Sequence, residues 1–234
     1  RLLVPIVDAF RHRLVVAEVH RESDDVVSLV MEGRDLRRLS PKPGQFFLWR
    51  FLDRKRIWAA HPFSLSEAPN GDSLRITVKA LGDFTRELGE IRAGTRVVTE
   101  GPFGVFTADA RRGSKTLLIG GGIGITPIRA MMEELQHDAI VLYRVISDAE
   151  AVLRDELEEL ARSTGAVVHV LVGDHATPEG AGLLTPDHIR ELVPDVARRD
   201  VFLCGPPGMV TATRASIRAL GVPRARIHTE RFAY

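Results

Sequence analysis

Residues 115–135, KTLLIGGGIGITPIRAMMEEL, constrain the fold more than any other part of the chain. Their first half is a short β-branched and leucine run that ends in glycines, which predicts a strand followed by a tight turn. Behind the turn, Thr126 can cap a helix, Pro127 suits its first position, and apolar residues recur at helical spacing up to Leu135. A glycine turn at a helix N-terminus favours an anion such as a pyrophosphate.

The spacing of these glycines is not decisive by itself. Ile125 or Pro127 stands where a third motif glycine would be, and no Gly-Lys-Ser/Thr follows that would make a nucleoside triphosphate loop. A plain tight turn between two packed elements is the alternative.

The composition excludes several classes of function. A net charge of +1 gives no field of one sign, so no nucleic-acid partner is expected. The single cysteine excludes an internal disulfide and a four-cysteine cluster, and no metal site is predicted. No apolar run reaches the roughly 18 residues of a membrane span, and no signal peptide opens the chain. We expect a cytoplasmic soluble domain, which as a fragment beginning at Arg1 can be the cytosolic part of a membrane protein.

The first half of the sequence alternates apolar and polar residues with a period near two. Residues 26–31 and 74–78 are typical strands, and turns rich in proline and glycine separate such runs. This pattern predicts a small antiparallel β-barrel or sandwich. A charged segment, residues 108–115, follows it. We place the domain boundary there and expect domains at residues 1–109 and 110–234.

After residue 115, strands and helices alternate. The predicted strands are 116–119, 139–146, 166–172, 201–204 and 226–229, and the predicted helices are 127–137, 149–163, 186–192 and 209–220. Ser147 and Glu150 form a capping box that opens the second helix, and Gly221 ends the last one. The alternation predicts an α/β doubly wound parallel sheet, whose ligands bind at the carboxyl ends of the strands.

Motifs along nearly the whole chain occur in the order seen in one family. They are His61-Pro62-Phe63-Ser64-Leu65-Ser66, Val78-Lys79-x-x-Gly82-x-x-Thr85, Gly101-Pro-Phe-Gly104, Gly120-Gly-Gly122-x-Gly124-x-Thr126-Pro127, Cys204-Gly205-Pro206-Pro-Gly208-Met209 and Glu230-Arg-Phe232. The set resembles the ferredoxin–NADP reductase superfamily. His-Pro-Phe after Trp58 is most similar to the dehydrogenase domain of NADPH oxidases and bacterial ferric-reductase-like proteins. The resemblance implies an FAD-binding barrel followed by an NAD(P)H-binding domain.

The resemblance assigns the flavin contacts to the first three motifs. Phe63 and Ser64 match an aromatic that packs on the flavin and a hydroxyl that hydrogen-bonds near its N5. The family's arginine is His61 here, which has an ordinary pKa of about 6.5, so weak FAD binding is expected. Lys79, Gly82 and Thr85 match a second phosphate segment. The other implied contacts are Pro62, Leu65, Ser66, Val78, Gly101 and Gly104.

The coenzyme contacts fall in the second domain. Gly122, Gly124, Thr126 and Pro127 match the dinucleotide turn, and Cys204, Gly205 and Pro206 match a later coenzyme motif. Arg144 and Ser147 stand where the adenine ribose is read, with Arg154 further along; a cation and a hydroxyl there favour NADPH. An acid there suits NADH, so Asp148 leaves NADH open; the alternative is that Asp148 only stabilises the N-terminus of the following helix. The alternative for Arg154 is a surface ion pair with Glu150 or Glu158.

The resemblance also implies the reaction. Ser64, Cys204 and Glu230 match a polar trio around the nicotinamide and flavin N5, while Phe232, or alternatively Tyr234, stacks on the flavin. Hydride would pass from NAD(P)H to FAD, and single electrons to an acceptor, expected to be a membrane haem domain preceding this segment. The alternatives are a free-standing reductase of ferredoxin, ferric chelates or oxygen, and a dinucleotide-sensing module without turnover.

Overall fold

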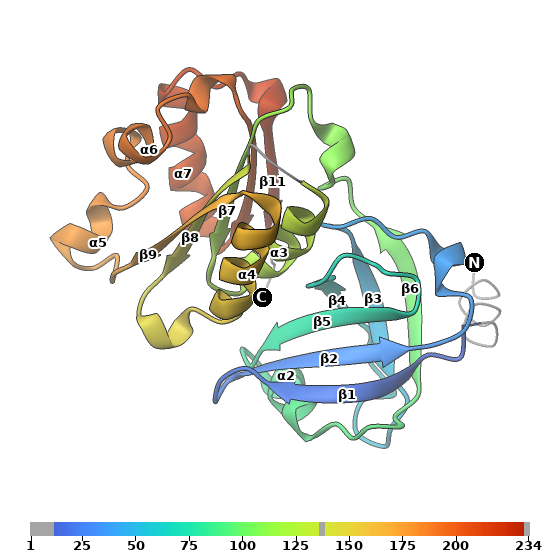
Figure 1. Cartoon of the computed structure of the whole chain (residues 1–234). Helices are drawn as coiled ribbons and strands as arrows, with labels where there is room; N and C mark the ends of the chain where they lie inside the picture. Colours follow the sequence, from blue (N-terminus) through green and yellow to red (C-terminus); the bar gives the residue numbers. More distant parts are fainter. Residues whose placement is uncertain (1–11, 136–138, 232–234) are drawn as a thin grey trace. The chain divides into compact units, whose positions relative to one another are not determined.

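The computed structural model describes residues 12–135 and 139–231. Backbone contacts divide the chain into two compact units, Arg1–Thr107 and Ala108–Tyr234 (Figure 1). We call them the barrel unit and the α/β unit.

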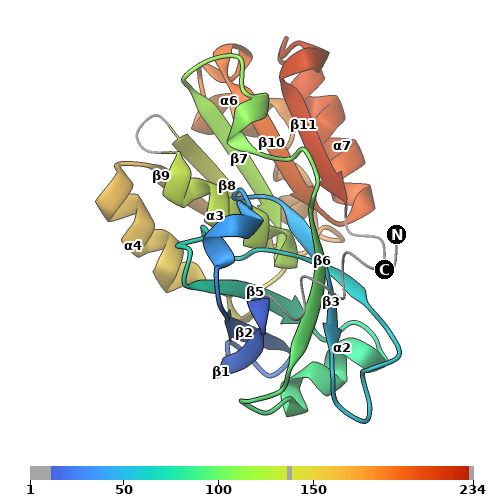
Figure 2. The ribbon, with the colours of Figure 1, turned by 90° about the vertical axis from the view of Figure 1, so that its right-hand side faces the viewer.

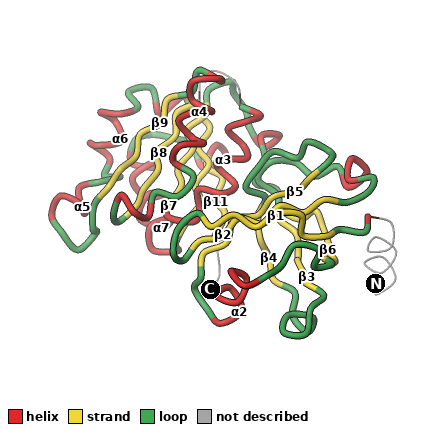
Figure 3. Tube along the Cα trace, turned by 60° about the horizontal axis from the view of Figure 1, so that its bottom comes forward, coloured by secondary structure: helices red, strands yellow, loops and turns green. Residues whose placement is uncertain are grey.

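The described strands of the barrel unit form two antiparallel sheets, drawn in yellow in Figure 3. In sheet order they are β1 (Val15–Arg21), β2 (Val26–Glu32) and β5 (Ser73–Lys79), then β4 (His61–Ser64), β3 (Phe46–Phe51) and β6 (Val97–Phe103). Val15 bridges Arg96, just before β6, and Leu65, just after β4, bridges Ile76. Because the two sheets are joined at both edges, they close into a barrel. The predicted antiparallel β-domain is confirmed.

Alternation along the strands builds the core of the barrel. In β3, the side chains of Phe47, Trp49 and Phe51 are fully buried, while their neighbours in the strand are partly exposed. The short helices α2 (Asp83–Glu87), η1 (Leu36–Leu39) and η2 (Leu88–Glu90) connect strands. Period-two patterning therefore separates inside from outside as the sequence predicted.

The α/β unit contains a five-stranded parallel sheet. Its order is β11 (Ile227–Arg231), β10 (Asp200–Gly205), β7 (Thr116–Gly121), β8 (Ala139–Val145) and β9 (Val167–Val172). The chain enters at β7, builds outward through β8 and β9, and returns on the other side of β7 as β10. This reversal makes the carboxyl ends of β7 and β10 the topological switch point, where ligands bind in such sheets.

Helices cover both faces of this sheet. Figures 1 and 2 show α3 (Ile125–Glu134) and α4 (Arg154–Thr164) on one face, and α6 (Pro186–Leu192) and α7 (Pro207–Ala219) on the other. Alternate residues of the buried strands, such as Ile119 and Leu203, pack with Ile217 of α7 in one core cluster. The predicted doubly wound fold is confirmed. Among the described helices, none combines the length and apolar content needed to cross a membrane.

Three predicted helix starts differ from the structure, and the last of these helices, α7, begins at Pro207 instead of residue 209. Residues 148–150 form a separate 3₁₀ turn, η5 (Asp148–Glu150), and α4 begins only at Arg154, because Leu153 adopts a left-handed conformation that interrupts the helical path. The Ser147 side chain makes no capping hydrogen bond. A second 3₁₀ turn, η4 (Gly122–Gly124), puts Gly124 at the N-cap of α3. Thr126 therefore lies inside the first turn, where its hydroxyl donates to the Ile123 carbonyl at 3.1 Å.

Two short helices were not predicted, α2 in the barrel unit and α5 (Pro178–Gly182) in the α/β unit. The helix α5 follows β9, and its N-cap Thr177 accepts a hydrogen bond from the Gly180 N–H at 3.1 Å. Its signal in the sequence is Thr-Pro, a capping residue followed by proline at the first helical position.

Candidate functional site

The strand predicted to hold the flavin, β4, is fixed from its neighbour β3. The Trp49 indole Nε1 donates to the Phe63 carbonyl at 3.0 Å, and the Phe63 ring packs partly buried against the barrel core. The Ser64 side chain is only 5% exposed, and its hydroxyl makes no hydrogen bond to another described residue. A hydroxyl held in place without a partner fits a hydrogen bond to a bound cofactor.

His61, at the start of β4, stacks on Phe84 of α2 with ring centroids 3.7 Å apart. Burial lowers the pKa of His61 below its usual 6.5, so the imidazole is neutral at pH 7. It therefore lacks the permanent charge that an arginine would place against a pyrophosphate. Phe84 was not predicted; its only signal is an aromatic between Gly82 and Thr85 of the second flavin motif.

The second flavin motif is mostly engaged within the barrel unit. The Lys79 ammonium lies 3.4 Å from an Asp25 carboxylate oxygen. The Thr85 hydroxyl accepts from the N–H groups of Leu81 and Gly82, each at 2.9 Å, and donates to the Gly82 carbonyl. A Cβ added at Gly82 would meet nothing within 4 Å, so this glycine leaves space for a ligand to approach the backbone.

Several predicted flavin contacts lie inside the barrel. Leu65, Ser66 and Val78 are buried. The Ser66 hydroxyl accepts from Thr77 at 2.8 Å, and Thr77 in turn lies 2.8 Å from the Ser28 hydroxyl. Pro62 is exposed; Gly101 and Gly104 have positive φ, and a Cβ at Gly101 would meet Phe47. Their flavin roles stay predictions.

The glycine turn of the α/β unit packs directly on the end of β10. A Cβ at Gly124 would lie 2.5 Å from the Cys204 carbonyl oxygen of β10, and one at Gly121 would clash with the Met209 sulfur of α7. Gly122 differs, because its φ is +52° and its Cβ would point into open space. The turn thus approaches β10 on one side and leaves room on the other, beside the positive end of α3. This arrangement fits a pyrophosphate.

Cys204 and Glu230 lie side by side at the same edge of the sheet. Cys204 pairs with Gly120 of β7 and with Glu230 of β11 in the strand register. Burial, with the nearby Glu230 carboxylate, raises the pKa of the Cys204 thiol, which is 0% exposed. Burial also raises the pKa of Glu230. The structure thus brings together two members of the predicted trio; the third, Ser64, belongs to the barrel unit.

The residues predicted to read the adenine ribose lie at and after the carboxyl end of β8, with Arg154 at the start of α4. The Arg144 guanidinium donates to the carbonyls of Val145, Gly173 and Gly180, and burial lowers its pKa. Ser147 is exposed, and Arg154 pairs with Asp148 at 3.2 Å and with Glu158 at 3.0 Å.

The remaining predicted coenzyme contacts differ in exposure. Thr126 and Pro127 are buried, whereas Pro206 is exposed after β10. Phe232 and Tyr234 lie outside the described residues.

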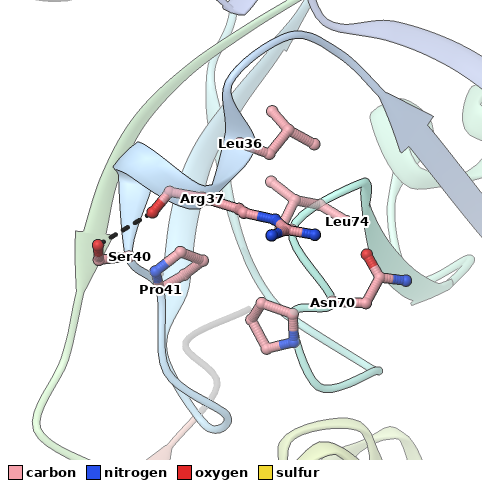
Figure 4. A pocket seen from close by; sticks show the side chains of 8 residues that line it. Leu36, Arg37, Ser40, Pro41, Asn70 and Leu74 are labelled. Atoms are coloured by element: carbon pink, nitrogen blue, oxygen red, sulfur yellow. Dashed lines mark hydrogen bonds between the residues drawn. The ribbon is translucent and has the colours of Figure 1, made fainter.

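The barrel unit also has a pocket of about 210 Å³ between η1 and the loop before β5 (Figure 4). The Arg37 side chain reaches into it beside Leu74 and Asn70. No residue predicted to bind FAD lines this pocket, so it stands apart from the proposed flavin site.

Comparison with known proteins identifies both units. The family described as FAD-binding domain matches residues 11–107, and the oxidoreductase NAD-binding domain family matches residues 118–215. A flavohemoprotein of Chromobacterium violaceum is 31% identical over 93% of this chain and 59% of its own length. The ferredoxin reductase component of 3-ketosteroid-9-alpha-monooxygenase from Mycolicibacterium smegmatis is 32% identical over 94% of this chain and 65% of its own length.

A solved structure extends the likeness to the whole fold. The flavohem-like FAD/NAD-binding domain of nitric oxide dioxygenase from Vibrio cholerae matches with a TM-score of 0.77 and 26% identity, covering 95% of this chain and 99% of that one. A barrel that binds FAD, followed by a doubly wound domain that binds a pyridine nucleotide, defines a class of flavin-dependent oxidoreductases. The chain combines these two family domains, and its structural neighbours fall in the ferredoxin–NADP reductase superfamily. It spans 59% and 65% of the lengths of the two curated relatives.

Proposed function

We propose that this chain takes reducing equivalents from a pyridine nucleotide and passes them singly to a haem-bearing partner. When bound, the two cofactors supply the redox chemistry: the nicotinamide gives a hydride, and the flavin accepts it and releases electrons one at a time. The observation that carries the proposal is the switch point, where the glycine turn, Cys204 and Glu230 meet at one edge of the sheet.

The residues at this edge suit orientation of a coenzyme better than acid–base catalysis. The raised pKa of Cys204 keeps the thiol protonated at pH 7, so it presents a small, uncharged group. The Gly122 turn and the α3 N-terminus hold the pyrophosphate, while Phe63 and Ser64 hold the flavin ring. A module that only senses a dinucleotide needs the phosphate turn alone, so the retention of Ser64, Cys204 and Glu230 favours the enzyme.

The acceptor is proposed from the relatives. The Chromobacterium violaceum relative is named a flavohemoprotein, which favours a haem. The His-Pro-Phe motif favours the membrane haem domain found in NADPH oxidases and ferric reductases, which would make this chain the cytosolic part of such a protein. A second candidate acceptor is a ferredoxin, because the Mycolicibacterium smegmatis relative is named a ferredoxin reductase component.

One experiment separates these acceptors. The FAD-reconstituted chain is reduced anaerobically with NADH or NADPH and mixed with oxidised cytochrome b5 or with a plant-type [2Fe–2S] ferredoxin. We expect the haem Soret band to shift to its reduced position faster than the ferredoxin bleaches. Faster reduction of the ferredoxin would overturn the haem assignment in favour of the second candidate.

The affinity for FAD gives a further prediction. Because His61 is neutral at pH 7, His61→Arg adds a permanent cation near the proposed pyrophosphate, and we expect the Kd for FAD to fall on the order of tenfold. Fluorescence titration of the apoprotein with FAD measures this change. His20→Arg, on the exposed part of β1, is the matched control and should leave the Kd unchanged. Unchanged or weaker binding by His61→Arg would count against a phosphate role for this position.

A further inference from the structure

The coenzyme preference is decided at the carboxyl end of β8, where the strand register places Arg144 beside Gly121 of the glycine turn. In doubly wound sheets, a side chain after the second strand reads the adenine ribose. An acid there suits the free 2′-hydroxyl of NADH, and an arginine suits the 2′-phosphate of NADPH. The charged side chains at the carboxyl end of β8 therefore indicate whether NADH or NADPH binds.

The Arg144 side chain is hydrogen-bonded to backbone carbonyls. Its guanidinium donates to Val145 on its own strand, to Gly173 after β9 and to Gly180 in α5. Turning toward a 2′-phosphate would break these three hydrogen bonds and offset part of the gain from the new one, although the Val145 and Gly180 carbonyls would still accept from the N–H groups of Gly173 and Leu183. The NADPH preference predicted from the sequence depends on Arg144 as a cation facing the ribose, and these three hydrogen bonds remove that basis. Arg144 acts as a positioning residue that ties the segment after β9 to β8.

The Arg154 side chain is also engaged, in ion pairs that include the Asp148 carboxylate. It forms ion pairs with Asp148 at 3.2 Å and with Glu158 at 3.0 Å. The Asp148 side chain remains 75% exposed and lies in the turn directly after β8. Its carboxylate is thus both anchored and accessible at the position from which the ribose is read.

The charged side chains around Asp148 are also mainly negative. Residues 144–164, from the end of β8 through α4, contain six carboxylates and three guanidinium groups, and one of the carboxylates, Glu156, also pairs with Arg129 of α3 at 2.7 Å. A 2′-phosphate would bring about two further negative charges to this surface, whereas a free 2′-hydroxyl would bring none. Repulsion by an excess of like charge disfavours NADPH and leaves NADH unaffected.

We propose that Asp148 is the specificity-determining residue of the coenzyme site and that the chain prefers NADH: its carboxylate accepts hydrogen bonds from the ribose hydroxyls and repels a 2′-phosphate. The inference rests on the proposed function, because it takes the glycine turn to be a pyridine-nucleotide site.

The test measures binding apart from turnover. Calorimetric titration of the FAD-loaded chain with ADP-ribose and with 2′-phospho-ADP-ribose compares the two ribose forms without a nicotinamide. We expect ADP-ribose to bind on the order of tenfold to a hundredfold tighter. Equal binding, or tighter binding of the 2′-phosphate, would overturn the inference, as would failure of both probes to bind. Flavin reduction by NADH and NADPH is followed in parallel, so a protein that prefers ADP-ribose but is never reduced contradicts only the proposed function.

Three variants test which residue determines the preference for ADP-ribose over 2′-phospho-ADP-ribose. Asp148→Asn should lower the ratio of the two affinities by about tenfold or more, through weaker binding of ADP-ribose and tighter binding of its 2′-phosphate. Asp187→Asn is the matched control, because Asp187 is also an exposed acid paired with an arginine, on α6, and it should leave the ratio unchanged. Arg144→Ala should weaken both probes equally. Selective loss of the 2′-phosphate probe in Arg144→Ala, or an unchanged ratio in Asp148→Asn, would refute the assignment.

Discussion

Gly124→Ala should lower kcat/KM for the pyridine nucleotide on the order of a hundredfold while the FAD site of the barrel unit stays intact. The new Cβ would lie 2.5 Å from the Cys204 carbonyl oxygen and 2.7 Å from Gly205 Cα, which are backbone atoms that cannot rotate away. The turn must then separate from β10, at a cost of about 1–3 kcal/mol for overpacking. A displacement of even about 1 Å in a coenzyme-holding turn is enough for a loss of this size.

Steady-state kinetics measure this loss, and circular dichroism checks that the variant folds. Gly182→Ala is the matched control, because a Cβ at Gly182 meets nothing within 4 Å in the same unit. It should keep wild-type kinetics. Wild-type kcat/KM in Gly124→Ala would show that the turn does not hold the coenzyme.

Ser64→Ala should slow flavin reduction about tenfold to a hundredfold and leave FAD bound. The Ser64 hydroxyl has no hydrogen-bond partner among the described residues, which leaves it available to the flavin, and a hydrogen bond that strengthens in the transition state is worth roughly 1.5–3 kcal/mol. Anaerobic stopped-flow absorbance measures the rate of reduction, and the flavin spectrum before mixing measures occupancy.

Ser28→Ala separates this effect from general weakening of the barrel. Ser28 is buried and hydrogen-bonded to Thr77, so its loss should lower the free energy of unfolding by about 1 kcal/mol without changing the reduction rate. If Ser64→Ala and Ser28→Ala slow reduction by the same factor, Ser64 has only a structural role.

Most of the fold could be predicted because its signals are local. Period-two alternation in β3 and β5 and the glycine run at the end of β7 specify strands, turn and parallel topology within short windows. The predicted helix starts were wrong where the local backbone conformation differs from the one that the sequence pattern indicates. Leu153 at φ 59° delays to Arg154 a helix that the capping box predicted to begin earlier, and a 3₁₀ turn displaced Thr126 from the cap of α3.

The candidate site was less predictable, because its side chains are engaged by distant parts of the chain. Arg144 is held by carbonyls 29 and 36 residues away, which no local spacing reveals. The stacking of His61 on Phe84 likewise joins β4 to α2. The adjacency of Cys204 and Glu230 was expected only through resemblance, and it follows here from the register of β10 and β11.

Reduction of the flavin by the pyridine nucleotide in this chain alone is the decisive test of the proposed hydride transfer. The FAD-reconstituted protein is mixed anaerobically with one equivalent of NADH, and in parallel with NADH deuterated at nicotinamide C4. We expect the oxidised flavin bands to bleach stoichiometrically, and deuterium at the transferred position to slow the bleaching. A protein that binds both FAD and ADP-ribose but keeps the oxidised flavin spectrum would contradict hydride transfer and would identify the chain as a sensing module.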